Sequence, residues 1–134
     1  MSLITIKHQK EFRVTAAIRT HTLTLDVPVE QSGQDAGPTP VELLAAAVGS
    51  CMAMHIAKYC KAAKLPHEGF GLDLDFQMAK DPLRIGSLTV DIELPPGFPR
   101  DRIDAVKRAA EQCPVKNSLK ESTAVAVEVL AEVQ

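Results

Sequence analysis

Three cysteines and one histidine are the residues of this 134-residue chain whose types and spacing could support chemistry. Cys51 and His55 are four positions apart, so on a helix they would lie one turn apart on the same side. A thiolate there could act as a nucleophile or a metal ligand, although most cysteines inside helices only fill space. Cys60 fits that packing role, because it falls close to the opposite face of the helix from Cys51. Cys113 is the remaining thiol.

The reactivity of Cys51 depends on a positive neighbour, because it lies about three turns inside its predicted helix, where the helix dipole has faded. Arg19 and His55 are the candidates, and Arg19 is the better one, since a guanidinium stays charged and donates in a planar fork. Cys113 falls at the predicted end of a second helix, where the dipole disfavours a thiolate, which suits a thiol attacked second. If Pro114 instead begins another helix, Cys113 is its N-cap and this effect reverses.

A metal site formed by Cys51, His55 and Cys113 is a second possibility for these residues. Zinc sites usually show closely spaced ligand pairs such as C-x-x-C or H-x-x-x-H, and neither occurs in this sequence. We therefore expect no metal and no other cofactor, and we expect His55 to form a pocket wall rather than to act as a ligand or base.

The stretch from Gly37 to Ala63 predicts the helix that carries the first cysteine. Thr39 can act as N-cap, Pro40 has the preset φ of a first helical residue, and Glu42 follows the cap by three positions, as in a capping box. Residues 41–57 are apolar almost all the way round, so we expect burial on more than one side. The run is too short and too interrupted to span a bilayer, which indicates a soluble core helix.

The other predicted elements are strands, one further helix and one helical turn. Apolar and polar residues alternate, as expected for strands, over Leu3–Lys7, Phe12–Ile18, His21–Val27, Gly69–Gln77, Ser87–Leu94 and Ala124–Val133. Apolar spacing predicts a second helix over Arg100–Gln112, and Val115–Lys120 could form one more turn. This order predicts an α+β fold, in which antiparallel sheets pack on a long buried central helix and a second helix.

The composition indicates one globular domain spanning residues 1–134, with 46% hydrophobic and 24% charged residues. An aromatic content of 4% and a net charge of −2 argue against a nucleic-acid partner. The N-terminus lacks the apolar region of a secretory signal, and we expect no membrane partner. These features predict a cytoplasmic protein whose cysteines are kept reduced unless they do redox work.

Four motifs occur in an order that resembles the OsmC-like family, which includes osmotically inducible protein C and the organic hydroperoxide resistance proteins. They are R-x-H at Arg19–His21, Asp26-x-Pro28, GPTPVELLAAAVGSC over Gly37–Cys51, and CPVKNSL over Cys113–Leu119. The resemblance covers nearly the whole chain. It implies an intertwined α+β homodimer of OsmC-like fold, with active sites at the subunit interface and a part in the oxidative stress response.

The resemblance also implies a thiol-dependent peroxidase, because members of the family reduce organic and inorganic hydroperoxides. On the matching positions, Cys51 attacks the peroxide and becomes a sulfenic acid, and Cys113 condenses with it to a disulfide. A dithiol such as a lipoyl group then reduces that disulfide. His55 and Met54, on the helix face of Cys51, are expected to line the substrate pocket.

Arg19 matches the arginine that holds the thiolate in this family, with Arg13 as the alternative, and Glu42 matches the carboxylate that orients the arginine. In hydroperoxide resistance proteins the glutamate directly follows the proline, whereas Val41 intervenes here. That shift turns the carboxylate by about 100° around the helix. The sequence therefore resembles the broader OsmC-like branch of the family.

Two other functions are compatible with the same residues. A binding module of this fold would capture a small ligand at the dimer interface and leave both thiols unchanged. A purely structural role for all three cysteines is the third interpretation, and native thiol labelling would distinguish it.

Overall fold

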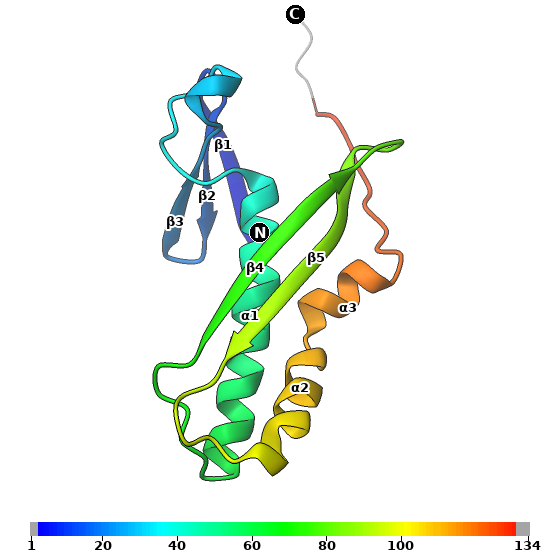
Figure 1. The fold of residues 1–134 in the computed structure, drawn as a ribbon. Helices are drawn as coiled ribbons and strands as arrows, with labels where there is room; N and C mark the ends of the chain where they lie inside the picture. The colour runs from blue at the N-terminus through cyan, green and yellow to red at the C-terminus, as the bar shows by residue number, and fades with distance from the viewer. Residues whose placement is uncertain (1–2, 131–134) are drawn as a thin grey trace, which may run out of the picture. The chain divides into compact units, whose positions relative to one another are not determined.

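The computed structural model describes residues 3–130 and contains strands, helices and two short 3-10 helices. In chain order the elements are β1 (Ile4–Lys10), β2 (Arg13–Ile18), β3 (His21–Leu25), η1 (Val29–Gln31), α1 (Pro40–Ala62), β4 (Gly71–Ala79), β5 (Arg84–Glu93), η2 (Arg100–Arg102), α2 (Ile103–Glu111) and α3 (Pro114–Lys120) (Figure 1). The backbone divides into two compact units. The first takes the described residues up to Gly49 and Leu72–Ile92, and the second takes Ser50–Gly71 and the described residues from Glu93. The expectation of one domain stays a prediction.

In the first unit, β1, β2 and β3 form an antiparallel sheet in sequence order, as the alternating pattern predicts. Arg19 and Thr20 make the turn between β2 and β3, because Ile18 and His21 are paired on either side of it. β3 ends at Leu25, two residues before the predicted end. The N–H of Asp26 turns away from the sheet and donates to the carbonyl of Pro38, at 3.2 Å.

The two remaining strands, β4 and β5, form a hairpin whose arrows run in opposite directions, as predicted (Figure 1). Leu74 of β4 lies against Gly49 of α1, where a Cβ atom on the glycine would sit 2.5 Å from a methyl carbon of the leucine. A side chain at this position would force the strand away. The small residues of the central helix therefore allow the close approach that the sequence predicts.

The second unit contains the later part of α1, together with α2 and α3. Val106 and Ala110 of α2 are buried, as the predicted apolar stripe requires, whereas Ile103 is 46% exposed. The first three residues of the helix predicted over residues 100–112 form a 3-10 turn, η2, which is wound more tightly than an α-helix, and the α-helix itself is α2. The turn after Pro114 is confirmed as α3.

The central helix α1 is far less covered by its own chain than its apolar circumference predicts. Only 28% of its most apolar window is buried, and Met54 is 72% exposed. Its 23 residues are also long and apolar enough, by length and composition alone, to cross a membrane, so the expectation that it is too short is wrong. The core helix of a soluble protein passes the same test, so length alone does not separate the two environments.

The predicted final strand is wrong over residues 124–130. This segment has no regular secondary structure, and Val125, Val127 and Val129 are each more than 80% exposed. A strand needs a neighbour to accept its backbone hydrogen bonds, and no strand of this chain pairs with the described part of the segment. The rest of the predicted strand, residues 131–133, lies outside the described residues.

Candidate dithiol site

The second unit brings Cys51 and Cys113 together, although they are 62 positions apart in the sequence. Their thiols are hydrogen-bonded to each other, and both are free cysteines. Cys51 lies on α1 and is partly exposed, whereas Cys113 is fully buried. A small molecule that approaches this pair from solvent therefore meets Cys51 first.

Cys113 is the N-cap of α3, not the end of the preceding helix. α2 ends at Glu111, the backbone of Cys113 is extended, and Pro114 takes the first helical position. The Cys113 sulfur accepts the backbone N–H of Lys116 at 3.3 Å, as the hydroxyl of a serine or threonine cap would. The interpretation of Cys113 as a helix C-terminus, where the dipole disfavours a thiolate, is therefore wrong.

The surroundings of Cys51 within this unit favour its neutral form. The hydrogen bond with Cys113 raises the pKa of the Cys51 thiol most, and burial raises it further. The backbone N–H of Val115, in the first turn of α3, donates to the Cys51 sulfur and lowers the pKa, but it does not reverse the shift. A positive group is thus still required to make Cys51 a thiolate near neutral pH.

Arg19 and Glu42, the two predicted partners of Cys51, belong to the first unit. Glu42 completes the predicted capping box: its Oε1 accepts the N–H of Thr39 at 2.8 Å, and its own N–H donates to the Thr39 hydroxyl at 3.1 Å. Arg19 is exposed in the β2–β3 turn, with a positive φ of 54°. Within residues 3–130 neither side chain makes an ion pair, so the first unit does not join Arg19 to Glu42.

Arg13, the alternative arginine, is already engaged by a buried carboxylate. Its Nε lies 3.9 Å from Oδ2 of Asp26, and its guanidinium donates to the side-chain oxygen of Gln34. Nε itself is buried and makes no hydrogen bond among the described residues. Because Asp26 and Gln34 hold Arg13, Arg19 is the more available of the two cations.

Asp26 is a feature that the residue patterns alone did not single out. Its carboxylate is buried and accepts the backbone N–H groups of Val27, Gln34 and Ala36, at 2.8, 3.2 and 3.1 Å. Burial acts to raise the pKa of Asp26, but the three N–H donors and Arg13 together outweigh it and hold the pKa below its ordinary value. The available signal was an acidic residue directly before a polar loop rich in glycine and proline.

The loop after Asp26 closes tightly around this carboxylate. A Cβ atom at Gly33 would meet the carbonyl oxygen of Val27 at 2.1 Å, and one at Gly37 would meet that of Thr24 at 2.0 Å. No side chain fits at either position, so these glycines let the loop pass against the β3 backbone. The loop thus holds the residues that lead into the α1 cap.

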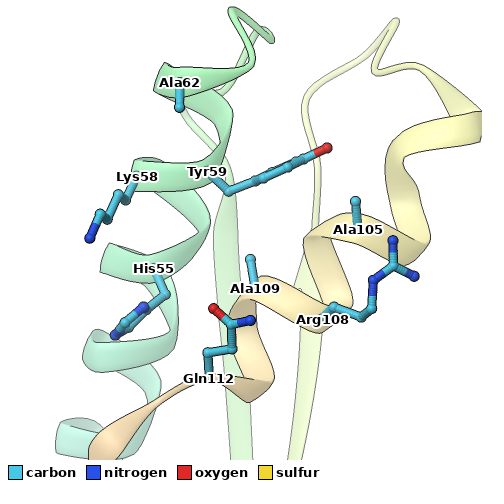
Figure 2. A pocket seen from close by; sticks show the side chains of 8 residues that line it. All are labelled: His55, Lys58, Tyr59, Ala62, Ala105, Arg108, Ala109 and Gln112. Carbon is cyan, nitrogen blue, oxygen red and sulfur yellow. The ribbon is translucent and has the colours of Figure 1, made fainter.

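Of the predicted pocket residues, His55 lines a groove between α1 and α2, while Met54 is not among the residues that line this groove and is largely exposed. The groove has a volume of about 450 Å³. Its walls also include residues that the sequence patterns did not select: Lys58, Tyr59, Ala62, Ala105, Arg108, Ala109 and Gln112 (Figure 2). Cys60 is fully buried, and burial raises the pKa of its thiol, as expected for a packing residue.

Within the described residues, no three His, Cys, Asp or Glu side chains are grouped so that they could hold a metal ion. The proposed ligand set of Cys51, His55 and Cys113 is therefore not assembled as a metal site. The chemistry that this arrangement supports is the chemistry of two thiols.

Comparison with solved structures shows the same fold in bacterial proteins of low sequence identity. A Psychrobacter arcticus protein, proposed to act in osmotic stress and detoxification responses, has a TM-score of 0.81 at 23% identity, covering 88% of each chain. The organic hydroperoxide resistance protein OsmC of Legionella pneumophila has a TM-score of 0.64 at 20% identity, covering 90% of each chain. OhrB of Bacillus subtilis, also an organic hydroperoxide resistance protein, has a TM-score of 0.64 at 18% identity, covering 89% of this chain and 90% of its own.

No curated protein sequence matches the chain closely enough to serve as a relative. The sequence profile of the OsmC-like proteins, however, matches residues 33–128, which include both cysteines of the pair and the whole of α1. That match spans most of the 134 residues and agrees with the α+β architecture of the solved structures. The chain belongs to the OsmC-like protein family.

Proposed function

We propose that this protein is a thiol-dependent peroxidase that reduces organic hydroperoxides, with Cys51 as the attacking thiol and Cys113 as the resolving thiol. The observation that carries the proposal is the hydrogen bond between the two thiols. Two thiols that share a hydrogen bond are neighbours, so a modest movement can bring their sulfurs to bonding distance. The hydroperoxide resistance proteins that share this fold support the choice of substrate class.

The proposed cycle uses only the two thiols, the peroxide and an external dithiol. The Cys51 thiolate attacks the outer oxygen of the hydroperoxide, the O–O bond breaks, and the alkoxide that leaves takes up the proton released from Cys51. The resulting sulfenic acid is attacked by Cys113, and water leaves as the disulfide forms. A dithiol, such as a lipoyl group, then exchanges with the disulfide, becoming oxidised itself and restoring both thiols.

The different exposures of the two cysteines support this division of roles. Cys51 is partly open to solvent, whereas Cys113 is fully buried, so a peroxide reaches Cys51. Because Cys113 raises the pKa of the Cys51 thiol, the proposal requires a cation to stabilise the thiolate. We assign that role to Arg19, whose guanidinium has no ion-pair partner among residues 3–130.

In this proposal Glu42 orients Arg19 in addition to capping α1. One carboxylate oxygen accepts the N–H of Thr39, while Oε2 makes no hydrogen bond among the described residues and is available to a guanidinium. In hydroperoxide resistance proteins the glutamate directly follows the proline, whereas Val41 intervenes here. A Glu42→Gln variant tests whether Glu42 orients Arg19 from this shifted position. That variant keeps the cap acceptor and should slow peroxide reduction by weakening the hold on Arg19.

We also propose that the active form is a cytoplasmic homodimer. A second copy would cover the exposed apolar faces of α1 and supply a pairing partner for residues 124–130, whose valines lie open in the single chain. Burying such surface is favourable by about 25 cal/mol per Å². Sedimentation equilibrium should give twice the mass of the chain, and a monomer at micromolar concentration would contradict the assembly.

Dithiol-driven consumption of an alkyl hydroperoxide tests the proposed activity. The wild-type protein should consume peroxide catalytically, and Cys51→Ser should lose this activity, because a hydroxyl is not ionised or oxidised under these conditions. Cys60→Ser is the matched control and should retain activity, since Cys60 lies away from the pair. Equal rates for wild type and Cys51→Ser would contradict the proposal and favour a binding protein of the same fold.

A further inference from the structure

The short helix α3, which follows the resolving cysteine, is held only weakly by its own side chains. It has seven residues, all of which the structure describes, and none of them is buried. Helices shorter than about 12 residues are marginal in water unless packing or caps support them. An ion pair joins Lys116 Nζ to Glu111 Oε2 at 3.9 Å, but both side chains are partly exposed, and such pairs add little. The stability of α3 therefore depends strongly on how its first turn is capped.

Sulfur atoms of the two cysteines cap that first turn. Pro114 takes the first helical position and has no N–H, so the first backbone donors of α3 belong to Val115 and Lys116. The N–H of Val115 donates to the sulfur of Cys51, and the N–H of Lys116 donates to the sulfur of Cys113 at 3.3 Å. The start of α3 thus depends on the positions of both sulfurs of the dithiol.

Formation of a disulfide must move at least one of these sulfurs, because a disulfide bond is shorter than any hydrogen-bonded separation. Cys51 lies on α1, which is anchored on either side of it by buried residues such as Val48 and Met52. The preceding helix α2 is anchored by the buried Val106. α3 has no such anchor. The movement therefore falls on Cys113 and the first turn of α3, which follows α2 after a break in the helix (Figure 1).

We propose that α3 is a redox-sensitive element, held by the two sulfurs in the reduced protein and loosened when Cys51 and Cys113 form a disulfide. Sulfur is a weak acceptor, so a hydrogen bond of 3.3 Å tolerates little displacement. In this step the two thiols lose two hydrogen atoms to the oxidant and one S–S bond forms. The inference rests on the proposed function for the existence of the disulfide, but not for the identity of the peroxide.

Loosening of α3 gives the buried sulfur of the pair a route to solvent. Cys113 is fully buried in the reduced protein, and its sulfur lies against the first turn of α3. Movement of that turn uncovers the sulfur, so an external dithiol can attack either end of the disulfide and not Cys51 alone. Reduction then restores both thiols and the cap. The helix is thus closed in the reduced protein and open in the oxidised protein.

Hydrogen–deuterium exchange of the whole protein, before and after oxidation with diamide, tests this inference. Diamide takes up the two hydrogen atoms and becomes a hydrazine, so the disulfide forms without any peroxide, and peptide mapping verifies that it joins Cys51 to Cys113. Amide exchange over residues 115–121 should be faster by roughly fivefold in the oxidised protein, because the helix has lost its N-cap. Exchange over α2 should not change, and a dithiol should restore slow exchange in α3.

Cys113→Ser is the matched control, because serine keeps an acceptor at the cap position but cannot form the disulfide. Diamide should leave exchange in its α3 unchanged. Cys60→Ser should respond to diamide as the wild type does, since Cys60 is not part of the pair.

Three results would overturn the inference and leave the proposed peroxidase function intact once the disulfide has formed. They are equal exchange of α3 in both redox states, a change that extends equally over α2, and fast exchange of α3 in the reduced protein. A failure of diamide to join Cys51 to Cys113 would instead contradict the proposed function and this inference together.

Discussion

Two helices of this protein begin with the same kind of cap made from different atoms. At the start of α1, the Thr39 hydroxyl accepts an N–H and Glu42 returns the bond, so two oxygens satisfy two backbone donors. At the start of α3, the sulfur of Cys113 accepts the N–H of Lys116. The hydroxyl of Thr39 serves only as a helix cap, whereas the sulfur of Cys113 can also be oxidised.

The α1 cap and the α3 cap differ in the groups that lie next to them. The α1 cap follows a loop that is held by the buried carboxylate of Asp26 through three backbone N–H groups. The α3 cap instead interacts with a second thiol, and the backbone N–H of Val115 in the first turn of α3 donates to that thiol. The same device therefore stabilises a fold at one helix and prepares a reactive pair at the other.

Of the three variants Cys113→Ser, Asp26→Asn and Thr39→Ala, the first should have the largest effect, and it separates these two uses of the α3 cap. Serine is a preferred N-cap, so the free energy of unfolding should be unchanged or slightly higher. Without the second thiol, a single peroxide should be consumed at Cys51, and dithiol-driven turnover should fall by roughly tenfold or more. Peroxide assays and urea unfolding of the same preparation measure both quantities. Retained turnover with a normal rate would show that Cys113 is only a cap.

Asp26→Asn should weaken the fold at the α1 end, because an amide is a weaker acceptor for three N–H donors and cannot pair with Arg13. The melting temperature at pH 7 should fall by several degrees, while Cys51 alkylation should be unchanged. The native pKa of Asp26 lies below its ordinary value of 3.8, so its contribution is complete above pH 3.8 and is lost as pH falls through the lower native pKa.

The pH dependence of the free energy of unfolding provides a control for the Asp26→Asn prediction. The difference in unfolding free energy between wild type and variant should be constant at neutral pH and should shrink only below pH 3.8. Thermal unfolding across this range measures it. A difference that stayed constant into strong acid would show that the carboxylate charge does not stabilise the loop.

Thr39→Ala should have the smallest effect of the three, because it removes one half of the α1 capping box and leaves the rest in place. The expected cost is about 1 kcal/mol of unfolding free energy, measured by urea denaturation. Thr39→Ser keeps the hydroxyl and should recover most of that loss. If Thr39→Ala unfolded like wild type, the hydrogen bond to Glu42 would contribute nothing.

The elements set by nearby residues could be predicted from the sequence. The α1 cap depends on Thr39, Pro40 and Glu42, which are neighbours, and its two hydrogen bonds form as expected. The first three strands and the hairpin follow from alternating side chains, and the α+β fold and its family are confirmed. In each case the information is local or carried by a colinear motif.

The features that escaped prediction depend on distant or missing partners. No local pattern shows that Cys51 and Cys113 meet across 62 positions. Whether the helix dipole favours or disfavours a thiolate at Cys113 depends on whether this residue ends α2 or begins α3, and the sequence around Pro114 allowed both. The segment 124–130 has strand-like alternation, but alternation cannot provide the neighbour that a strand needs. The burial of Asp26 arises from a loop folding back on it.

Peptide mass spectrometry after brief treatment with one equivalent of an alkyl hydroperoxide tests the central claim most directly. The account predicts a cross-linked peptide that joins Cys51 to Cys113, lighter by two hydrogen atoms than the two free peptides and absent from Cys51→Ser. The cross-link should disappear on addition of a dithiol, with Cys60 remaining a free thiol throughout. Two unmodified thiols after full exposure to peroxide, or a cross-link that uses Cys60, would contradict the account.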